Sequence, residues 1–105
     1  MPIDLDAIVS ESNLDLEFRE LSLKTLELDD DVTFGLEVFS PSGKIFSVDS
    51  VLGTITGTTS DITGIVSGKK LYLPIEIKSL GWNYITVEAN VGSEKFVFQK
   101  KVWVD

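Results

Sequence analysis

The sequence has 105 residues, which is enough for one domain and too few for two. It contains no His and no Cys, so disulfides, zinc sites, thiol nucleophiles and histidine general bases are excluded. Acidic residues outnumber basic ones by 17 to 9. The resulting net charge of −8 repels phosphate backbones and anionic lipid, so we expect neither nucleic acid nor a membrane as partner.

Residues 1–13 precede the regular pattern, and we expect them to form an extended arm on a single domain that spans residues 14–105. The arm is acidic where a secretory signal would be basic, and no stretch of the chain reaches the roughly 18 apolar residues of a membrane span. An arm with apolar residues such as Ile3 and Leu5 can add a strand to a neighbouring protein's sheet. Ile3 and Leu5 are therefore candidate partner contacts.

Residues 14–28 are rich in good helix formers, yet their apolar side chains do not form one helical stripe. Leu16 and Leu26 fall on the side of the helix opposite most of the other apolar residues. A two-residue alternation fits the segment with one slip at Arg19-Glu20. Such a slip is typical of a bulge or of a strand that changes sheets. We therefore predict strand over this segment.

From residue 32 onward apolar residues recur with period two, which predicts strands that each bury one face. The predicted inward residues are Val32, Phe34, Leu36 and Val38; Leu71, Leu73, Ile75 and Ile77; Ile85, Val87, Ala89 and Val91; and Phe96, Phe98, Val102 and Val104. Short strands separated by turns, with no convincing helix, predict an all-β antiparallel sandwich or barrel.

Turn-forming residues separate these runs. Ser40–Lys44 contains the Pro and Gly of a tight turn, and Asp29–Asp31 is a polar turn before the first long strand. Ser79–Gly81 and Val91–Glu94 are hairpin candidates. Residues Ser50–Gly68, rich in Thr, Ile and Gly, are expected to form short edge strands joined by loops.

Asp29, Asp30 and Asp31 form the densest group of carboxylates. Calcium prefers six to eight oxygen ligands, but a calcium loop alternates its ligands and needs a glycine, whereas three consecutive acids on an extended chain point in different directions. We therefore predict a solvated turn with no metal, and we regard the three residues as candidate contacts for a basic partner.

Five aromatic residues lie out of phase with the apolar faces of their strands. They are Phe39, Tyr72, Trp82, Tyr84 and Trp103. Rings on an outer face can bind a protein partner or stack on carbohydrate, and the alternative is that they are buried at the edges of a small sandwich. Trp82, Tyr84 and Trp103 are the candidate contacts that we select.

No motif in the sequence predicts an enzyme or a cofactor site. Gly64–Lys70 superficially suggests a phosphate loop, but it has three residues between its glycines instead of four, and a second Lys where the motif requires Ser or Thr. A pair of catalytic carboxylates would need a cleft that a 105-residue sandwich with short loops hardly provides. We expect neither a catalytic residue nor a cofactor.

The negative charge is concentrated in the first third of the chain. Residues 1–37 contain eleven acidic and two basic residues, whereas residues 38–105 contain six acidic and seven basic ones. A charge distribution this uneven can orient a molecule against its neighbours. We therefore expect the N-terminal third to face a basic surface.

Two segments resemble an immunoglobulin-like β-sandwich of the bacterial and bacteriophage kind. Leu36–Lys44 is similar to the strand and Pro-x-Gly-Lys turn of such domains, and Leu80–Ala89 is similar to their penultimate strand, in which a Gly-x-Tyr is followed by alternating apolar residues. A final hairpin that ends at Val102-Trp103-Val104 completes the likeness, which covers about two thirds of the chain.

The resemblance implies an antiparallel immunoglobulin-like fold and, for a chain with no signal and no Cys, a component of a bacteriophage virion. Members of this kind decorate capsids or are associated with tails, where they bind protein subunits, as oligomers or in larger assemblies, without chemistry. The alternative is a small module that binds carbohydrate or adheres to a host surface.

Overall fold

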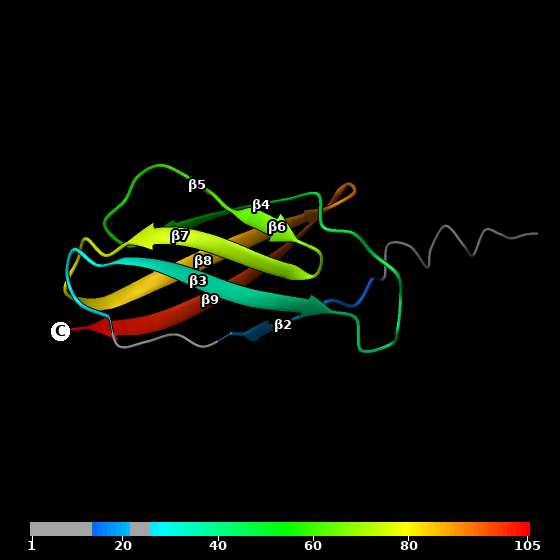
Figure 1. The fold of residues 1–105 in the computed structure, drawn as a ribbon, viewed down its shortest axis with the longest axis horizontal. Coiled ribbons are helices and arrows are strands. Elements are labelled where there is room, and N and C mark those ends of the chain that lie inside the picture. The colour runs from blue at the N-terminus through cyan, green and yellow to red at the C-terminus, as the bar shows by residue number, and fades with distance from the viewer. Residues whose placement is uncertain (1–13, 22–25) are drawn as a thin grey trace, which may run out of the picture.

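The computed structural model describes residues 14–21 and 26–105, and every regular element in this part is a β-strand (Figure 1). The strands are β2 (Glu17–Glu20), β3 (Asp31–Phe39), β4 (Ser50–Ile55), β5 (Ile62–Thr63), β6 (Ile65–Ser67), β7 (Lys70–Glu76), β8 (Gly81–Val91) and β9 (Glu94–Val104). The predicted arm at residues 1–13, with Ile3 and Leu5, lies outside the described residues. The described part contains no helix, hence none long and apolar enough to cross a bilayer.

The strands form two four-stranded antiparallel sheets, which confirms the all-β prediction. Sheet 1 has the order β2-β3-β7-β6, and sheet 2 has the order β5-β4-β8-β9. In Figure 1, β3 and β7 of sheet 1 lie in front of β8 and β9 of sheet 2. The two inner faces share one apolar core, so the sheets pack against each other.

The two-residue alternation predicted which side chains form this core. Phe34, Leu36 and Val38 of β3 are at most 1 % exposed, and the inward residues of β7 and β8 are similarly buried. Phe96 and Phe98 of β9 are half-buried, and Phe98 lies 6.2 Å from Phe34 between ring centroids. Contacts between rings from the two sheets help hold the layers together.

The segment 14–28 changes from one sheet to the other. Residues of β2 pair antiparallel with β3 in sheet 1, and Leu26 forms a parallel bridge with Val104 of β9 in sheet 2. The slip at Arg19-Glu20 coincides with the end of β2 at Glu20. The prediction of strand is confirmed for β2. Its pairing with β3 is regular through Arg19-Glu20, and the Leu21 N–H still donates to the Gly35 carbonyl, so there is no bulge at the predicted slip. Residues 22–25 lie outside the described part.

Only one of the two predicted hairpins is present. Val91 pairs with Glu94 across Gly92-Ser93, and Gly92 has a φ of +62°, as the first position of a tight hairpin turn requires. The prediction of a hairpin at Ser79–Gly81 is wrong, because β7 belongs to sheet 1 and β8 to sheet 2. This connection crosses from one sheet to the other. A local turn pattern cannot distinguish such a crossing from a hairpin within one sheet.

Residues Ser50–Gly68 form the predicted short edge strands only in part. Strands β5 and β6 lie at sheet edges, but β4 is an inner strand of sheet 2. The chain passes from β5 in sheet 2 to β6 in sheet 1 at Gly64. A Cβ at Gly64 would lie 2.5 Å from Val51 Cγ1 and 2.9 Å from the Tyr72 carbonyl oxygen, so only glycine fits between the layers.

The Ser40–Lys44 turn is present, and a carboxylate fixes it. Gly43 N–H donates to the Ser40 carbonyl at 2.9 Å. The Asp15 carboxylate accepts hydrogen bonds from both the Ser40 and Ser42 hydroxyls and from the Ser42 N–H, at 2.7 to 3.1 Å. These donors stabilise the charged carboxylate. The same hydrogen bonds attach the chain before β2 to the connection after β3.

We predict that Asp15 titrates well below an ordinary aspartate. Hydrogen bonds from the Ser42 and Ser40 side chains lower its pKa from 3.8 to about 2. Because the folded-state pKa is below the unfolded value, these bonds stabilise the fold above pH 4 and are lost as the pH falls through 2. Carboxyl NMR titration checks this, and S40A/S42A should return the pKa to the ordinary range. A normal Asp15 pKa in the wild-type protein would contradict it.

Candidate functional site

The outer face of sheet 2 presents a group of large apolar side chains that the sheet itself leaves uncovered. Trp82 and Tyr84 alternate with the buried residues of β8, and Trp103 does the same on β9. Their exposed fractions are 51 %, 47 % and 53 %, and Leu80 just before β8 is 59 % exposed. We call these four residues the aromatic surface. The prediction that the three rings lie out of phase with the core is confirmed.

The two tryptophans of this surface pack against each other across the strands. Trp82 and Trp103 are directly opposite in the β8–β9 register. Their ring centroids are 5.0 Å apart with an interplanar angle of 77°, the edge-to-face arrangement that aromatic pairs prefer. Trp103 Nε1 also donates to Asp105 Oδ1 at 2.6 Å. The rings are held in place before any partner binds, which reduces the entropy lost on binding.

A lysine lies within the aromatic surface. Lys101 is opposite Tyr84 in the register, and its Nζ lies 4.2 Å from the centroid of the Trp82 ring. This distance is that of a cation–π contact. None of the ion pairs formed by the described residues involves Lys101. The aromatic surface therefore includes a positive charge that forms no ion pair with a described carboxylate.

The predicted turn before the first long strand is present, but it lies at Leu28–Asp29, and Asp31 already belongs to β3. Asp29 adopts a φ of +70°, and its N–H donates to the Ile77 carbonyl at 2.8 Å. The Asp30 carboxylate accepts the Glu27 N–H at 3.0 Å. Within residues 14–21 and 26–105, no group of acidic side chains gathers where it could hold a metal ion. Asp31 begins β3 and is exposed.

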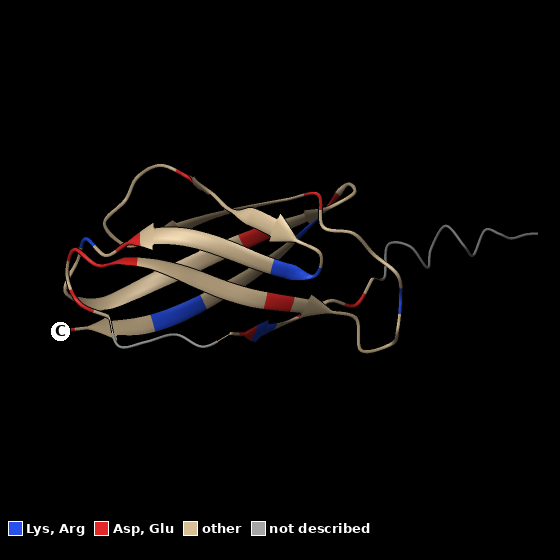
Figure 2. Cartoon of the chain, viewed as in Figure 1, with Lys and Arg blue, Asp and Glu red and all other residues tan. Residues whose placement is uncertain are grey.

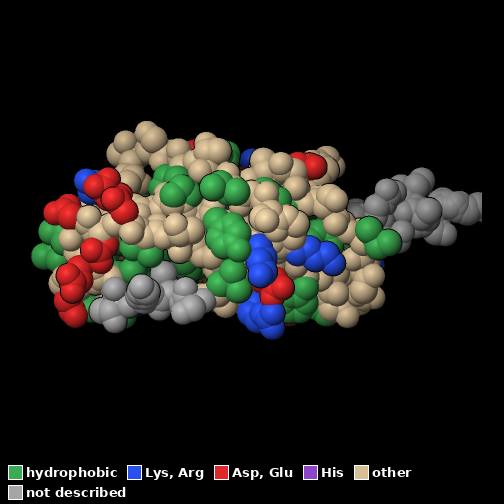
Figure 3. Space-filling view, viewed as in Figure 1, with side chains coloured by type: hydrophobic (Ala, Val, Ile, Leu, Met, Phe, Trp, Pro, Cys, Tyr) green, Lys and Arg blue, Asp and Glu red, His purple; other side chains and the backbone are tan. Residues whose placement is uncertain are grey.

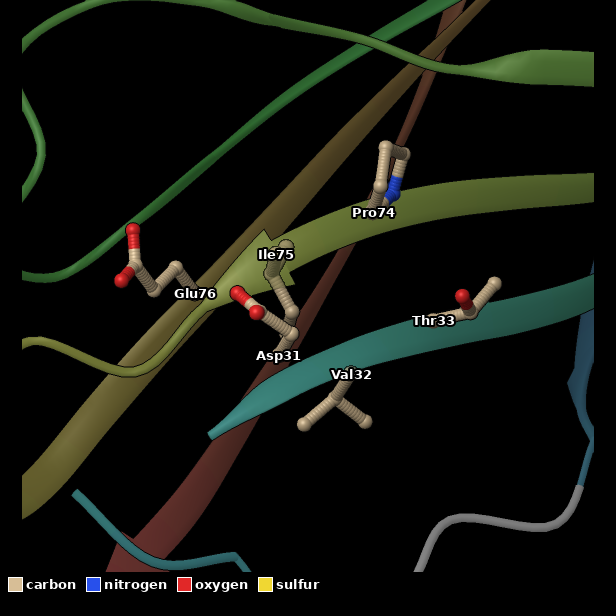
Figure 4. Close-up of a pocket in the computed structure, with 6 residues that line it drawn as sticks. All are labelled: Asp31, Val32, Thr33, Pro74, Ile75 and Glu76. Carbon is tan, nitrogen blue, oxygen red and sulfur yellow. The ribbon is translucent and has the colours of Figure 1, made fainter. Parts of the chain in front are cut away.

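Asp31 borders a shallow hollow on the outer face of sheet 1. The hollow has a volume of about 270 Å³ and lies over the β3–β7 pair. Asp31 is opposite Glu76 and Thr33 is opposite Pro74 in the register. Figure 4 shows the side chains of these residues above the sheet, while Val32 points away from them. The lining of the hollow thus combines the apolar ring of Pro74 with two carboxylates.

Lys78 is a cation at this acidic end. Its Nζ lies 2.8 Å from Glu76 Oε2, and the hydrogen bond to Glu76, aided by Asp29 and Asp31, raises its pKa above the ordinary value. One lysine therefore faces three carboxylates, and the end stays negative. Figure 2 shows acidic residues at the end of the molecule where β3 begins, and Figure 3 shows acidic side chains gathered at the same end.

Among residues 14–21 and 26–37, the acidic side chains of the first third do not form one acidic surface. Asp15 lies beside the connection after β3, whereas Asp29–Asp31 lie at the opposite end of that strand. Between them, Arg19 pairs with Glu37, and Glu20 pairs with Lys100 of β9 at 2.9 Å. Charge counted along the sequence cannot reveal these cross-strand ion pairs.

The structure brings some of the predicted contacts together and separates others. Trp82, Tyr84 and Trp103 share one surface, while Asp29, Asp30 and Asp31 lie at the same end of the molecule on the other sheet. Tyr72 and Phe39 lie on sheet 1, apart from them.

Sequence reasoning missed two residues beside these contacts, Lys101 and Glu76. Lys101 could have been found from the sequence, because the two-residue alternation places it on the same face of its strand as Trp103. The second required knowledge that β7 pairs with β3.

The aromatic surface has the chemical groups of a binding site. Aromatic rings with one ammonium provide apolar contact and a charge, which are the features of protein contact surfaces. A comparison with protein-family models, curated proteins and solved structures finds no match to this chain.

Proposed function

We propose that this chain is a non-enzymatic structural protein that acts through protein–protein contacts made by its aromatic surface, as a component of a bacteriophage virion. The observation that carries the proposal is the fixed, half-exposed pair Trp82–Trp103 with Tyr84 beside it. Tryptophan and tyrosine dominate the energetic centres of protein interfaces, and monomers rarely leave such groups uncovered without a use for them.

We further propose that the fold is immunoglobulin-like. The sheet orders β2-β3-β7-β6 and β5-β4-β8-β9 correspond to A-B-E-D and C′-C-F-G of that fold, with β8 and β9 as strands F and G. The sequence likeness of Leu36–Lys44 and Leu80–Ala89 falls on strands B and F of this correspondence. It favours capsid decoration or a tail-associated role, because virion domains of this type bind subunits.

The second candidate function is carbohydrate binding by the same rings. The half-exposed rings of Tyr84 and Trp103 favour it, since sugars stack on open aromatic faces. The arrangement of the tryptophans argues against it, because they are nearly perpendicular and Lys101 covers one face of Trp82. Protein contact is therefore our first choice.

Removal of the three rings is expected to weaken binding to a virion partner strongly. The test co-expresses the chain with the proteins encoded by neighbouring genes, which we expect to be capsid or tail genes. The variant W82A/Y84A/W103A should bind its partner at least about thirtyfold more weakly, because loss of one interface anchor alone costs roughly 2 kcal/mol.

The matched control is I45A/I65A, which removes two apolar side chains that are 98 % and 61 % exposed elsewhere on the surface. It should bind as the wild type does. Unchanged binding of the triple variant would contradict the proposal. So would a tryptophan fluorescence response to an oligosaccharide panel, with no protein partner found among the neighbouring gene products.

A further inference from the structure

We propose that the aromatic surface of one molecule docks on the hollow between β3 and β7 of a second copy, so that copies associate head to tail. This inference rests on the proposed function and names one partner for the same surface. The two patches belong to different outer faces of the molecule, and their charges complement each other.

The aromatic surface supplies the apolar part of this contact. Leu80, Trp82, Tyr84 and Trp103 are each about half exposed and lie next to one another at the start of β8 and the end of β9. Covering them with another protein would remove apolar area from water, which is the main favourable term in association. A partner therefore needs an apolar area of its own, flanked by charge opposite to that of Lys101.

The hollow on sheet 1 has these properties. Its lining includes the exposed Pro74, and the carboxylates of Asp31 and Glu76 stand on neighbouring strands beside it. Its volume of about 270 Å³ is below the roughly 300–1,000 Å³ of small-molecule sites, so it suits a single large side chain. An indole from the aromatic surface is a group of that kind.

Charge complementarity selects this hollow as the partner of the aromatic surface. Lys101 has no ion pair with any described carboxylate. Asp31 takes part in none of the ion pairs of the described residues either, and Glu76 shares its charge only with Lys78. Bringing Lys101 of one copy beside Asp31 and Glu76 of another offsets charges that both faces leave unbalanced.

The two faces cannot meet within one molecule. Trp82 and Tyr84 point outward from sheet 2, whereas Asp31 and Thr33 point outward from sheet 1, and the core lies between. The contact is therefore heterologous: each copy offers one face to the copy before it and the other face to the copy after it. Repetition produces a ring or an open chain, so the wild type should form assemblies larger than a dimer.

Charge reversal on each face separately tests the inference by sedimentation velocity at low ionic strength. K101E disables the aromatic surface, and D31K/E76K disables the hollow, so each variant alone should associate about tenfold more weakly. An equimolar mixture should recover assemblies larger than a dimer, because the unreversed faces of the two variants complement each other and so do their reversed faces. The combined variant K101E/D31K/E76K reverses both charges and should recover assemblies larger than a dimer.

K95E is the control on the same outer face of β9, at the other end of the strand, and it should associate as the wild type does. A wild type that stays monomeric at every concentration and salt level overturns this inference but leaves binding to a neighbouring gene product intact. Association that survives both charge reversals, or a mixture that associates no better than either variant alone, also overturns it.

Discussion

Replacement of Gly53 by alanine is expected to destabilise the domain by about 3 kcal/mol, because there is no space for a methyl group between the sheets. A Cβ at this position would lie 2.5 Å from Leu73 Cδ2 on the facing sheet and 2.7 Å from the Thr86 carbonyl oxygen. The leucine can shift, but the carbonyl belongs to the neighbouring strand β8 and is fixed by the ladder. Thermal denaturation should show a Tm lowered by more than about 10 °C.

Gly35→Ala is the matched control for this effect. Gly35 also lies within a long strand, but its nearest neighbours are side-chain atoms of Leu21 at 3.1 and 3.3 Å, which can move. We expect a much smaller loss of stability there. Equal losses at the two positions would show that the separation between the sheets is not what requires glycine at position 53.

Asn83→Asp is expected to destabilise the fold by about 3 to 5 kcal/mol at neutral pH, because it places an unpaired charge in the core. Asn83 is fully buried, and its Nδ2 donates to the Ser79 and Gly81 carbonyls at 2.9 and 3.2 Å. A carboxylate there would face two carbonyl oxygens in place of the amide donor. These two hydrogen bonds fix the crossing from β7 to β8 that positions Leu80 and Trp82.

The loss of stability in Asn83→Asp should increase as the pH rises. Burial raises the folded-state pKa of the introduced aspartate above its unfolded value of about 3.9, so the penalty grows as the pH rises above 4 and is smallest below it. Denaturant unfolding at several pH values measures this. Asn90→Asp is the control, since Asn90 lies on the outer face of β8 and bonds to Ser50 Oγ. A pH-independent loss at position 83 would contradict the assignment of its amide as a buried donor.

Short-range alternation was enough to predict the core and the outward aromatic rings. Period two assigns Phe34 and Ile85 to the inside and Trp82 and Trp103 to the outside without knowledge of which strands pair. The turn residues at Val91–Glu94 likewise predicted a hairpin, because a two-residue loop with glycine has one dominant outcome.

Sheet membership could not be predicted in this way. The connection at Ser79–Gly81 has the composition of a hairpin, yet it crosses between layers because Asn83 anchors it from the core. The hollow beside Asp31 depends on the pairing of β3 with β7, whose sequences are about forty residues apart. Such non-local pairing is decided by side-chain packing, so local sequence patterns do not predict it.

The central claim is that the outer face of β8 and β9 is where this protein meets other proteins. Hydroxyl-radical footprinting of the protein, free and assembled, tests it most directly, with Phe39 on sheet 1, 37 % exposed, as the internal reference. The claim predicts that Trp82, Tyr84 and Trp103 become protected on assembly while Phe39 reacts as before. Equal reactivity of the three rings in the free and assembled protein would contradict it.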